Sequence, residues 1–262
     1  MQIYLPSNGR IEINKVNMRQ PKISDIRESQ EFSNDLELRK TQFVRLLCGN
    51  DPNVDCLTLY DRNYLFVIAV ASLALNKLSF KAKCSHCGAP ISDFIDITQL
   101  DVVFLEEDIE CIKNIEGTDY KFRLLRVRDE VAALDYANLD DKHYESRLED
   151  AYVCASLDME INDENIEKVK NLDLSVYYSA QFFQICLAHG LSLQKHVSCK
   201  KCGAVTNVIL DIKGNMLNMD MSIIMDRYAA LAGKLDYQSF LDMTLPEYNF
   251  LVDSLNSKME NT

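Results

Sequence analysis

The chain has 262 residues, of which 47% are hydrophobic and 26% charged, a composition that fits a folded protein with one sizeable core or two modest ones. Its formal net charge of -12 repels phosphate backbones and anionic lipid heads, which argues against a general nucleic-acid-binding or membrane-surface protein. The most apolar run, residues 64–75, is too short to cross a bilayer, and the first residues lack the pattern of a signal peptide. We therefore expect a cytosolic protein with reduced thiols.

The first 112 residues predict a hairpin, helices and a pair of strands. Apolar and polar residues alternate on both sides of Asn8-Gly9, a dipeptide that favours a two-residue turn, so a hairpin is expected within residues 1–16. Its apolar positions are Ile3, Leu5, Ile11 and Ile13. Helical spacing predicts helices over 36–47 and 59–75. Strands are expected over 77–83 and 91–97, with the first cysteine pair between them.

Residues 113–172 predict a helical insertion between two similar parts of the chain. The acidic, weakly periodic residues 104–118 are expected to form a boundary, and alternation over 120–127 predicts a strand. Helical periodicity then recurs over 129–137, 144–157 and 165–172. The sequence thus divides into residues 1–112, 113–172 and 173–262.

The order helix, strand, cysteine pair, strand returns in the last part of the chain. It is expected as a helix over 175–187 and strands over 193–197 and 207–212. A helix over 222–233 and a capping box at Thr244 and Glu247 are then expected in the tail.

A seven-residue motif occurs twice, as KCSHCGA at 83–89 and as SCKKCGA at 198–204, with a constant offset of 115 residues. The same offset aligns Leu78 with Leu193, and Asp96 with Asp211, which indicates a duplication. The predicted fold class is α+β, mainly helical, with an N-terminal hairpin and two pseudo-repeated helix-strand-CxxCG-strand units.

The doubled motif predicts one structural zinc site. A C-x-x-C-G turn between two strands directs two sulfurs to one side, and its glycine allows backbone amides to face them. A structural zinc ion takes four ligands, so two such turns complete one site. The predicted ligands are Cys84, Cys87, Cys199 and Cys202.

Three other uses of these cysteines remain open. Disulfides within each turn are disfavoured in a reducing compartment, and a thioredoxin-like redox site would need a helix after the motif rather than a strand. Two separate half-sites, completed by His86 or His196, are the third. The single cysteines are expected to be small buried hydrophobic residues; they are Cys48, Cys56, Cys111, Cys154 and Cys186.

No catalytic residues are predicted. Residues 158–169 have acidic spacing similar to a calcium loop, but Asp163 takes the place of its glycine and Val169 that of its last glutamate. The sequence has no phosphate loop, dinucleotide fingerprint or nucleophile elbow, and His189 is expected to be a core or capping residue. Lysines flank both cysteine turns. They either form a docking surface for an acidic partner or nucleic acid, or balance the negative charge of the zinc-bound thiolates.

Three features of the sequence together resemble one protein family. They are the N-terminal L-P-S-x-G hairpin, the helix LTLYDRNYLFVIAVASLAL that runs into a strand and C-x-x-C-G, and the second C-x-x-C-G strand pair. This family is the baseplate hub assembly proteins of contractile-tailed, T-even-like bacteriophages, and the closing segment, residues 222–256, is similar to their helical tail. The paired cysteines match the family pattern at Cys84, Cys87, Cys199 and Cys202.

The resemblance implies a non-enzymatic protein that takes part in building the central hub of the baseplate by binding other hub and tail proteins. It implies a place in the host cytoplasm during assembly, and it leaves open whether the protein is retained in the tail baseplate of the virion or acts only as a transient assembly factor. No membrane or small-molecule partner is expected, and the net charge disfavours nucleic acid. The alternative function is a zinc-ribbon protein that binds nucleic acid in transcription or translation, favoured by the lysines at the cysteine turns and disfavoured by the charge of -12.

Overall fold

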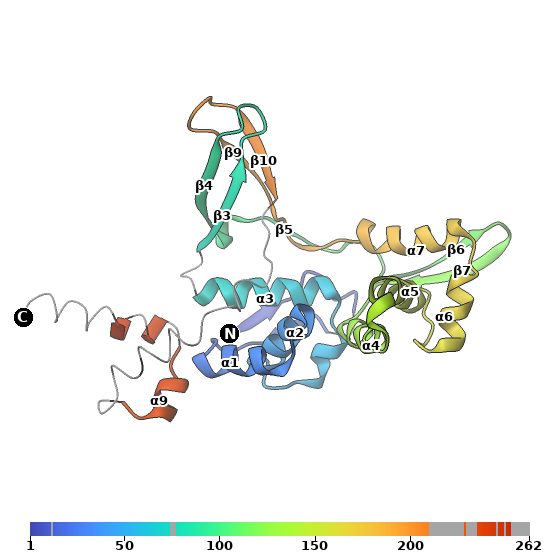
Figure 1. Cartoon of the computed structure of the whole chain (residues 1–262), viewed down its shortest axis with the longest axis horizontal. Coiled ribbons are helices and arrows are strands. Elements are labelled where there is room, and N and C mark those ends of the chain that lie inside the picture. The colour runs from blue at the N-terminus through green and yellow to red at the C-terminus, as the bar shows by residue number, and fades with distance from the viewer. Residues whose placement is uncertain are drawn as a thin grey trace, which may run out of the picture.

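The computed structural model describes residues 1–11, 13–73, 77–209, 228, 235–244, 246–248 and 250–252. Helices alternate with five two-stranded antiparallel sheets, as the predicted α+β class requires. Figure 1 shows three parts: central helices around α3 (Leu59–Leu73), a β knob that stands on one side of α3, and a helical lobe at one end. The division of the chain at 112 and 172, and the origin by duplication, stay predictions.

The N-terminal hairpin forms, but its second strand differs from the prediction. Strand β1 (Gln2–Tyr4) pairs with β2 (Lys15–Asn17), not with residues 11–13. Asn8 and Gly9 have positive φ angles of 53° and 75°, as a turn at this dipeptide requires. The loop is longer than a two-residue turn: the Leu5 amide still donates to the carbonyl of Asn14 at 2.9 Å, and Ile11 lies within the loop with its side chain buried in the core.

The central helices agree closely with the sequence prediction. Helix α1 (Ile23–Phe32) precedes α2 (Leu36–Leu47), which begins where Asp35 accepts hydrogen bonds from the amides of the first turn. A short 3-10 helix, η1 (Pro52–Cys56), leads to α3, which packs against α2 with Phe43 and Phe66 ring edge to ring face. Within the described residues, no helix has the length and apolarity needed to cross a membrane.

The end lobe consists of one hairpin and the helices from α4 to α7. The elements are β6 (Glu110–Ile115), β7 (Thr118–Arg123), α4 (Val127–Ala137), η3 (Asp141–His143), α5 (Tyr144–Ser156), α6 (Asp163–Lys170) and α7 (Leu174–Cys186). The four helices match their predictions within a few residues. The predicted strand over 120–127 is wrong at its end, because Val127 already begins α4.

Strand β6 is the longest strand that the sequence analysis does not predict. It runs through the acidic segment expected to be a boundary, and it pairs with β7 in register from Glu110–Arg123 to Ile115–Thr118. The turn consists of Glu116 and Gly117, whose φ angles of 53° and 86° suit a two-residue hairpin turn. Most of the strand is exposed, so its sequence lacks the alternation of a half-buried strand.

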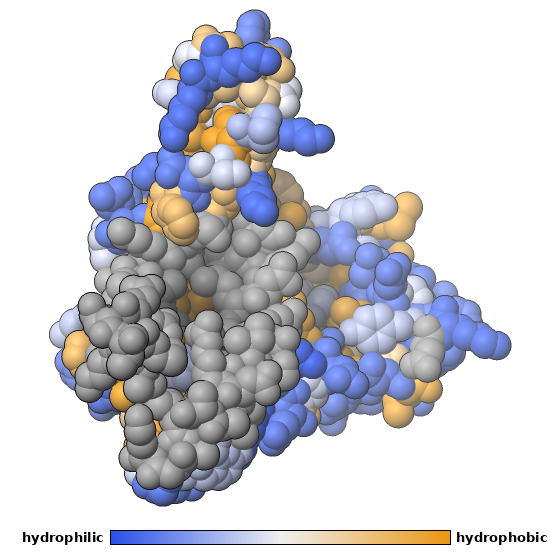
Figure 2. Space-filling model, turned by 60° about the vertical axis from the view of Figure 1, so that its left-hand side comes forward, coloured by the Kyte–Doolittle hydropathy of each residue, from blue (hydrophilic) through white to orange (hydrophobic). Residues whose placement is uncertain are grey.

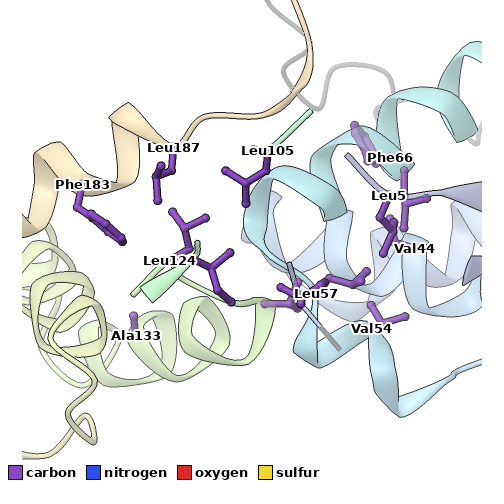
Figure 3. Close-up of a cluster of buried hydrophobic side chains, with 14 of the residues drawn as sticks. Leu5, Val44, Val54, Leu57, Phe66, Leu105, Leu124, Ala133, Phe183 and Leu187 are labelled. Atoms are coloured by element: carbon purple, nitrogen blue, oxygen red, sulfur yellow. The ribbon is translucent and has the colours of Figure 1, made fainter. Parts of the chain in front are cut away.

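One main core joins the central helices to the end lobe. Figure 3 shows its side chains running from the central helices to α7 without a break. The labelled residues are Leu5, Val44, Val54, Leu57, Phe66, Leu105, Leu124, Ala133, Phe183 and Leu187. Because Leu57 and Leu124 lie where the two parts meet, the central helices and the end lobe fold around shared apolar contacts.

A buried ion cluster joins α2, α3 and α4 beside this core. The guanidinium of Arg62 is 1% exposed and lies 2.9 Å from carboxylate oxygens of both Glu37 and Glu130. It also donates to the hydroxyl of Thr41 at 2.8 Å, and Lys40 lies 2.6 Å from Glu37. Desolvation raises the pKa of Glu130, and the charge of Arg62 opposes that shift.

The knob is built from two hairpins that are far apart in the sequence. Strand β3 (Lys77–Lys83) pairs with β4 (Pro90–Asp96), and β9 (Gln194–Ser198) pairs with β10 (Val205–Ile209). A small second core, which includes Val67 and Ala71 of α3, joins the base of the knob to the central helices. Below it, β5 (Val102–Val103) pairs with β8 (Gly190–Leu191) and brings the two halves of the chain together.

The tail is described only in part. The helix predicted over 222–233 lies outside the described residues except for Tyr228. A short helix, α9 (Tyr237–Leu241), packs Phe240 against Tyr248 and α1. The carboxylate of Glu247 accepts a hydrogen bond from the amide of Thr244 at 2.8 Å, as a capping box requires.

Candidate metal centre

The two cysteine turns have the same backbone geometry. In the first turn, the Cys84 amide donates to the carbonyl of Ala89 at 2.9 Å, and Gly88 donates to the carbonyl of Cys84 at 3.0 Å. In the second turn, Cys199, Ala204 and Gly203 make the same two bonds at 2.9 and 2.8 Å. Gly88 and Gly203 have φ angles of 67° and 74°, a region that L-residues with a Cβ rarely adopt. The glycine after each pair is therefore required by the turn.

The turns bring four sulfur atoms into one cluster at the top of the knob, the four-cysteine cluster of Cys84, Cys87, Cys199 and Cys202. All four sulfurs lie within 4.8 Å of one another. The Sγ atoms of Cys84 and Cys202 are 3.7 Å apart, and those of Cys87 and Cys199 are also 3.7 Å apart. In a tetrahedral site with Zn–S bonds of about 2.3 Å, neighbouring sulfurs lie about 3.8 Å apart. The cluster therefore has the size of a four-thiolate metal site.

The structure also decides between the alternatives for these cysteines. All four thiols are free, and the 3.7 Å contacts join a sulfur of one turn to a sulfur of the other. His86 and His196 are exposed and lie outside the group of ligand atoms. One shared cluster thus fits better than disulfides within each turn or two half-sites with histidine ligands.

Backbone amides around the cluster favour thiolates. Hydrogen bonds from the amides of Cys87 and His86 to the Cys84 sulfur lower the pKa of Cys84 to about 6. The amides of Cys202 and Lys201 lower the pKa of Cys199 in the same way. The amide of Ala204 lowers the pKa of Cys202, but desolvation and the neighbouring sulfurs raise it overall to about 12. The amide hydrogen bonds thus favour the thiolate form of Cys84 and Cys199, which is the form of cysteine that binds a metal.

Thr206 is a supporting residue that the sequence analysis missed. It is 5% exposed on β10, and its hydroxyl donates to the Cys84 sulfur at 3.7 Å while it accepts from the amide of Ser85 at 3.2 Å. The residue at the matching position of the first motif is Ile91, so the duplication gives no signal for it. Thr206 links the second hairpin to the turn of the first.

We expect Thr206→Val to weaken metal binding by about tenfold, because a hydrogen bond to a ligand sulfur is lost without a change of shape. The measurement is competition against a chelator of known affinity under reducing conditions. Thr206→Ser keeps the hydroxyl and is expected to bind as the wild type does. Equal affinity of the valine and serine variants would show that the hydroxyl has no part in holding the site.

The other five cysteines were all expected to be buried. One of them is buried, three are partly buried, and one is exposed. Cys154 is buried, and Cys48, Cys56 and Cys111 are partly buried. Cys186 is exposed, because it lies on the outer side at the end of α7, whose inner face carries the buried residues of that helix.

Lysines lie on the surface of the knob around the four-cysteine cluster. Lys81 and Lys83 on β3 and Lys200 and Lys201 in the second turn are exposed, and Lys195 is partly buried. Figure 2 shows hydrophilic residues along the edges of the knob and hydrophobic residues on the face between them. Phe94 on β4 and Ile209 on β10 are 68% and 71% exposed. The knob therefore offers both basic and apolar surface.

A buried aspartate and histidine form a second cluster of titratable groups. Oδ1 of Asp61 lies 3.7 Å from Nε2 of His189, and both side chains are 0% exposed. The Nδ1–H of His189 donates to the carbonyl of Leu187 at 2.8 Å, while Asp61 accepts from the amide of Ser7 at 3.0 Å. Desolvation raises the pKa of Asp61. The pair joins the hairpin, α3 and the chain after α7, and it has no exposed atom for a substrate to reach.

Comparison with known proteins does not identify a family. No protein-family model matches the chain, and neither a curated protein nor a solved structure matches it significantly.

Proposed function

We propose that the four-cysteine cluster binds one structural zinc ion. Four thiolates satisfy zinc completely, so such a site has no position for a substrate or water and contributes stability instead. The sulfur separations of 3.7 Å carry this proposal, together with the backbone amides directed at Cys84 and Cys199.

The zinc proposal predicts about one equivalent of zinc in protein purified with reductant and without chelator. Replacement by Co2+ should give the visible absorption of a tetrahedral four-thiolate site, which distinguishes four sulfur ligands from mixed sulfur and nitrogen ligands. A zinc content well below one equivalent in reduced protein would contradict the proposal.

The function that we propose is assembly of a bacteriophage baseplate hub by protein binding, without catalysis. The support is the family resemblance of the hairpin, the helix before the first cysteine pair, both C-x-x-C-G strand pairs and the tail. The knob that projects from α3 adds to it (Figure 1). A projecting element held by a closed metal site presents fixed apolar and basic side chains, here Phe94, Ile209 and the knob lysines, to another protein. We place this activity in the host cytoplasm during assembly, and presence in finished particles is one readout of the experiment below.

The exposed lysines of the knob favour one alternative, a zinc-ribbon protein that binds nucleic acid. Lys81, Lys83, Lys200 and Lys201 surround the cysteine turns, where phosphate groups would be attracted. The net charge of -12 opposes this alternative. Binding that weakens steeply with added salt would support it.

A gentle affinity purification from infected cells tests both functions. The tagged protein is isolated in physiological salt, co-purifying proteins are identified by mass spectrometry, and finished particles are treated in parallel. Recovery with hub and tail proteins supports the assembly function, and presence in particles separates a structural subunit from a transient factor. Recovery with polymerase, ribosome or nuclease-sensitive material overturns it in favour of nucleic-acid binding.

A further inference from the structure

Helix α7 is fixed to the end lobe by one face only. Val176, Ala180 and Phe183 on that face are buried in the main core. The side-chain amide of Gln184 donates to the carbonyl of Arg123 at 2.8 Å and accepts from the amide of Leu125 at 3.0 Å. Figure 1 shows α7 along the outside of the lobe, beyond α5. The position and rotation of the helix are therefore well defined.

The opposite face of α7 carries a stripe of large apolar side chains. Spacings of four, four and three residues place them along one line of the helix. They are Leu174, Tyr178, Phe182 and Ile185, which are 66%, 61%, 62% and 67% exposed. We call them the α7 stripe. None of the thirteen residues of α7 is charged. An uncharged row of this kind on a strongly charged protein marks a surface that another protein covers.

The α7 stripe is complementary to itself. When two copies of the helix lie antiparallel, Tyr178 of each meets Phe182 of the other, and Leu174 meets the end of the stripe at Ile185. Two rings thus pack against two rings, with an aliphatic contact at each end. In a parallel pair, each side chain would instead meet the same residue of the other copy. A two-fold axis perpendicular to the helix gives the antiparallel arrangement and not the parallel one.

Charge also favours a second copy at this surface. Two chains with a net charge of -12 repel one another over most of their surfaces, and α7 offers a contact with no charge on either side. The four exposed side chains correspond to roughly 1,000 Å² of surface in a symmetric pair, near the lower limit of specific interfaces. A pair of this size is reversible and weak, in the micromolar range of dissociation constants.

We propose that the protein forms a two-fold symmetric dimer in which the α7 stripes of two copies pack antiparallel. The dimer goes beyond the proposed hub function and does not depend on it. Because apolar burial drives this contact and like charges oppose it, added salt strengthens the dimer. Docking through the basic knob would instead weaken with salt.

Sedimentation of the metal-loaded full chain over a range of concentrations tests the dimer. The wild type is expected to dimerise in the micromolar range, and more tightly as salt is raised. Phe182→Glu, which places two like charges in the middle of the pair, is expected to weaken dimerisation at least tenfold. The matched control is Leu139→Glu, because Leu139 is 75% exposed and lies after α4, away from α7.

A disulfide cross-link tests the antiparallel direction in a Cys186→Ser background, which removes the native exposed thiol of α7. Leu174→Cys together with Ile185→Cys is expected to give a cross-linked dimer under mild oxidation, because residue 174 of each copy lies beside residue 185 of the other. Leu174→Cys alone in the same background is expected to remain uncross-linked, since its two new thiols lie at opposite ends of the helix pair.

Several results would overturn the proposal. A wild type that stays monomeric at concentrations of several hundred micromolar excludes the dimer. Equal weakening by Phe182→Glu and Leu139→Glu, or none by either, excludes the α7 stripe as its interface. Cross-linking by Leu174→Cys alone in the Cys186→Ser background excludes the antiparallel direction. A monomer that captures a different protein through Phe182 shows that the stripe belongs to that partner and not to a second copy.

Discussion

Replacement of Cys199 by serine is expected to abolish stoichiometric metal binding and to unfold the knob, while the main core stays folded. A structural zinc site contributes on the order of 10 kcal/mol in small metal-binding peptides, and three thiolates with a serine hydroxyl lose most of it. Among the described residues, the apolar contacts of the knob form two small clusters, one near the cysteines and one at its base. The core between the central helices and the end lobe is separate from both.

Hydrogen exchange, with metal content measured in parallel, resolves the two parts. In Cys199→Ser, amides of β3, β4, β9 and β10 are expected to lose protection, and those of α2, α3 and α5 to keep it. Cys186→Ser is the matched control, because it is the same substitution at an exposed cysteine outside the cluster. Full metal content in Cys199→Ser would contradict the four-thiolate site, and loss of protection everywhere would show that the knob supports the whole fold.

The four-cysteine cluster could be predicted from sequence because each half of it is local. The C-x-x-C-G motif sets its own turn, with a glycine at positive φ, and the strands on both sides follow from short apolar patterns. Only the contact between the two cysteine turns is long-range in the sequence. The repetition of the motif is what predicted that the two turns share one site. The central helices were predictable for a similar reason, since a cap such as Asp35 and helical spacing are read within one segment.

The parts that the sequence did not reveal depend on contacts between segments. Strand β6 is mostly exposed and has no apolar alternation, although Glu116-Gly117 was a turn signal that could have indicated it. The second strand of the N-terminal hairpin lies at Lys15–Asn17 rather than at residues 11–13, and Ile11 is buried within the loop. Thr206 is an ordinary strand residue in the sequence, and its role depends on the contact of its hydroxyl with the sulfur of Cys84. Strand β6 therefore lacked a local alternation, and Thr206 is defined by a contact between two segments that are far apart in the chain.

The second large effect is expected at Arg62, whose replacement by methionine should destabilise the protein by about 3–5 kcal/mol. Methionine fills similar volume but leaves the Glu130 carboxylate, 3% exposed, without its 2.9 Å cation. The other carboxylate, Glu37, is a third exposed and keeps its ion pair with Lys40 at 2.6 Å. The loss of folding free energy therefore comes mainly from the unpaired, buried charge of Glu130. Urea unfolding monitored by circular dichroism measures the change. Arg10→Met, which breaks an exposed ion pair with Asp108, is the matched control and should cost less than about 1 kcal/mol.

The pH dependence of Arg62→Met identifies Glu130 as the cause. Desolvation already raises the pKa of Glu130 in the folded wild type, and loss of the Arg62 charge raises it further. A carboxyl with a raised folded pKa favours the folded state when protonated, so stability is lost as pH rises through that pKa and returns as pH falls toward the unfolded value of about 4.3. The difference between Arg62→Met and wild type should therefore shrink between pH 7 and pH 5. Adding Glu130→Gln to Arg62→Met should recover part of the stability at pH 7 and remove the pH dependence. If the loss of stability in Arg62→Met alone does not change with pH, its cause is altered packing and not the Glu130 charge.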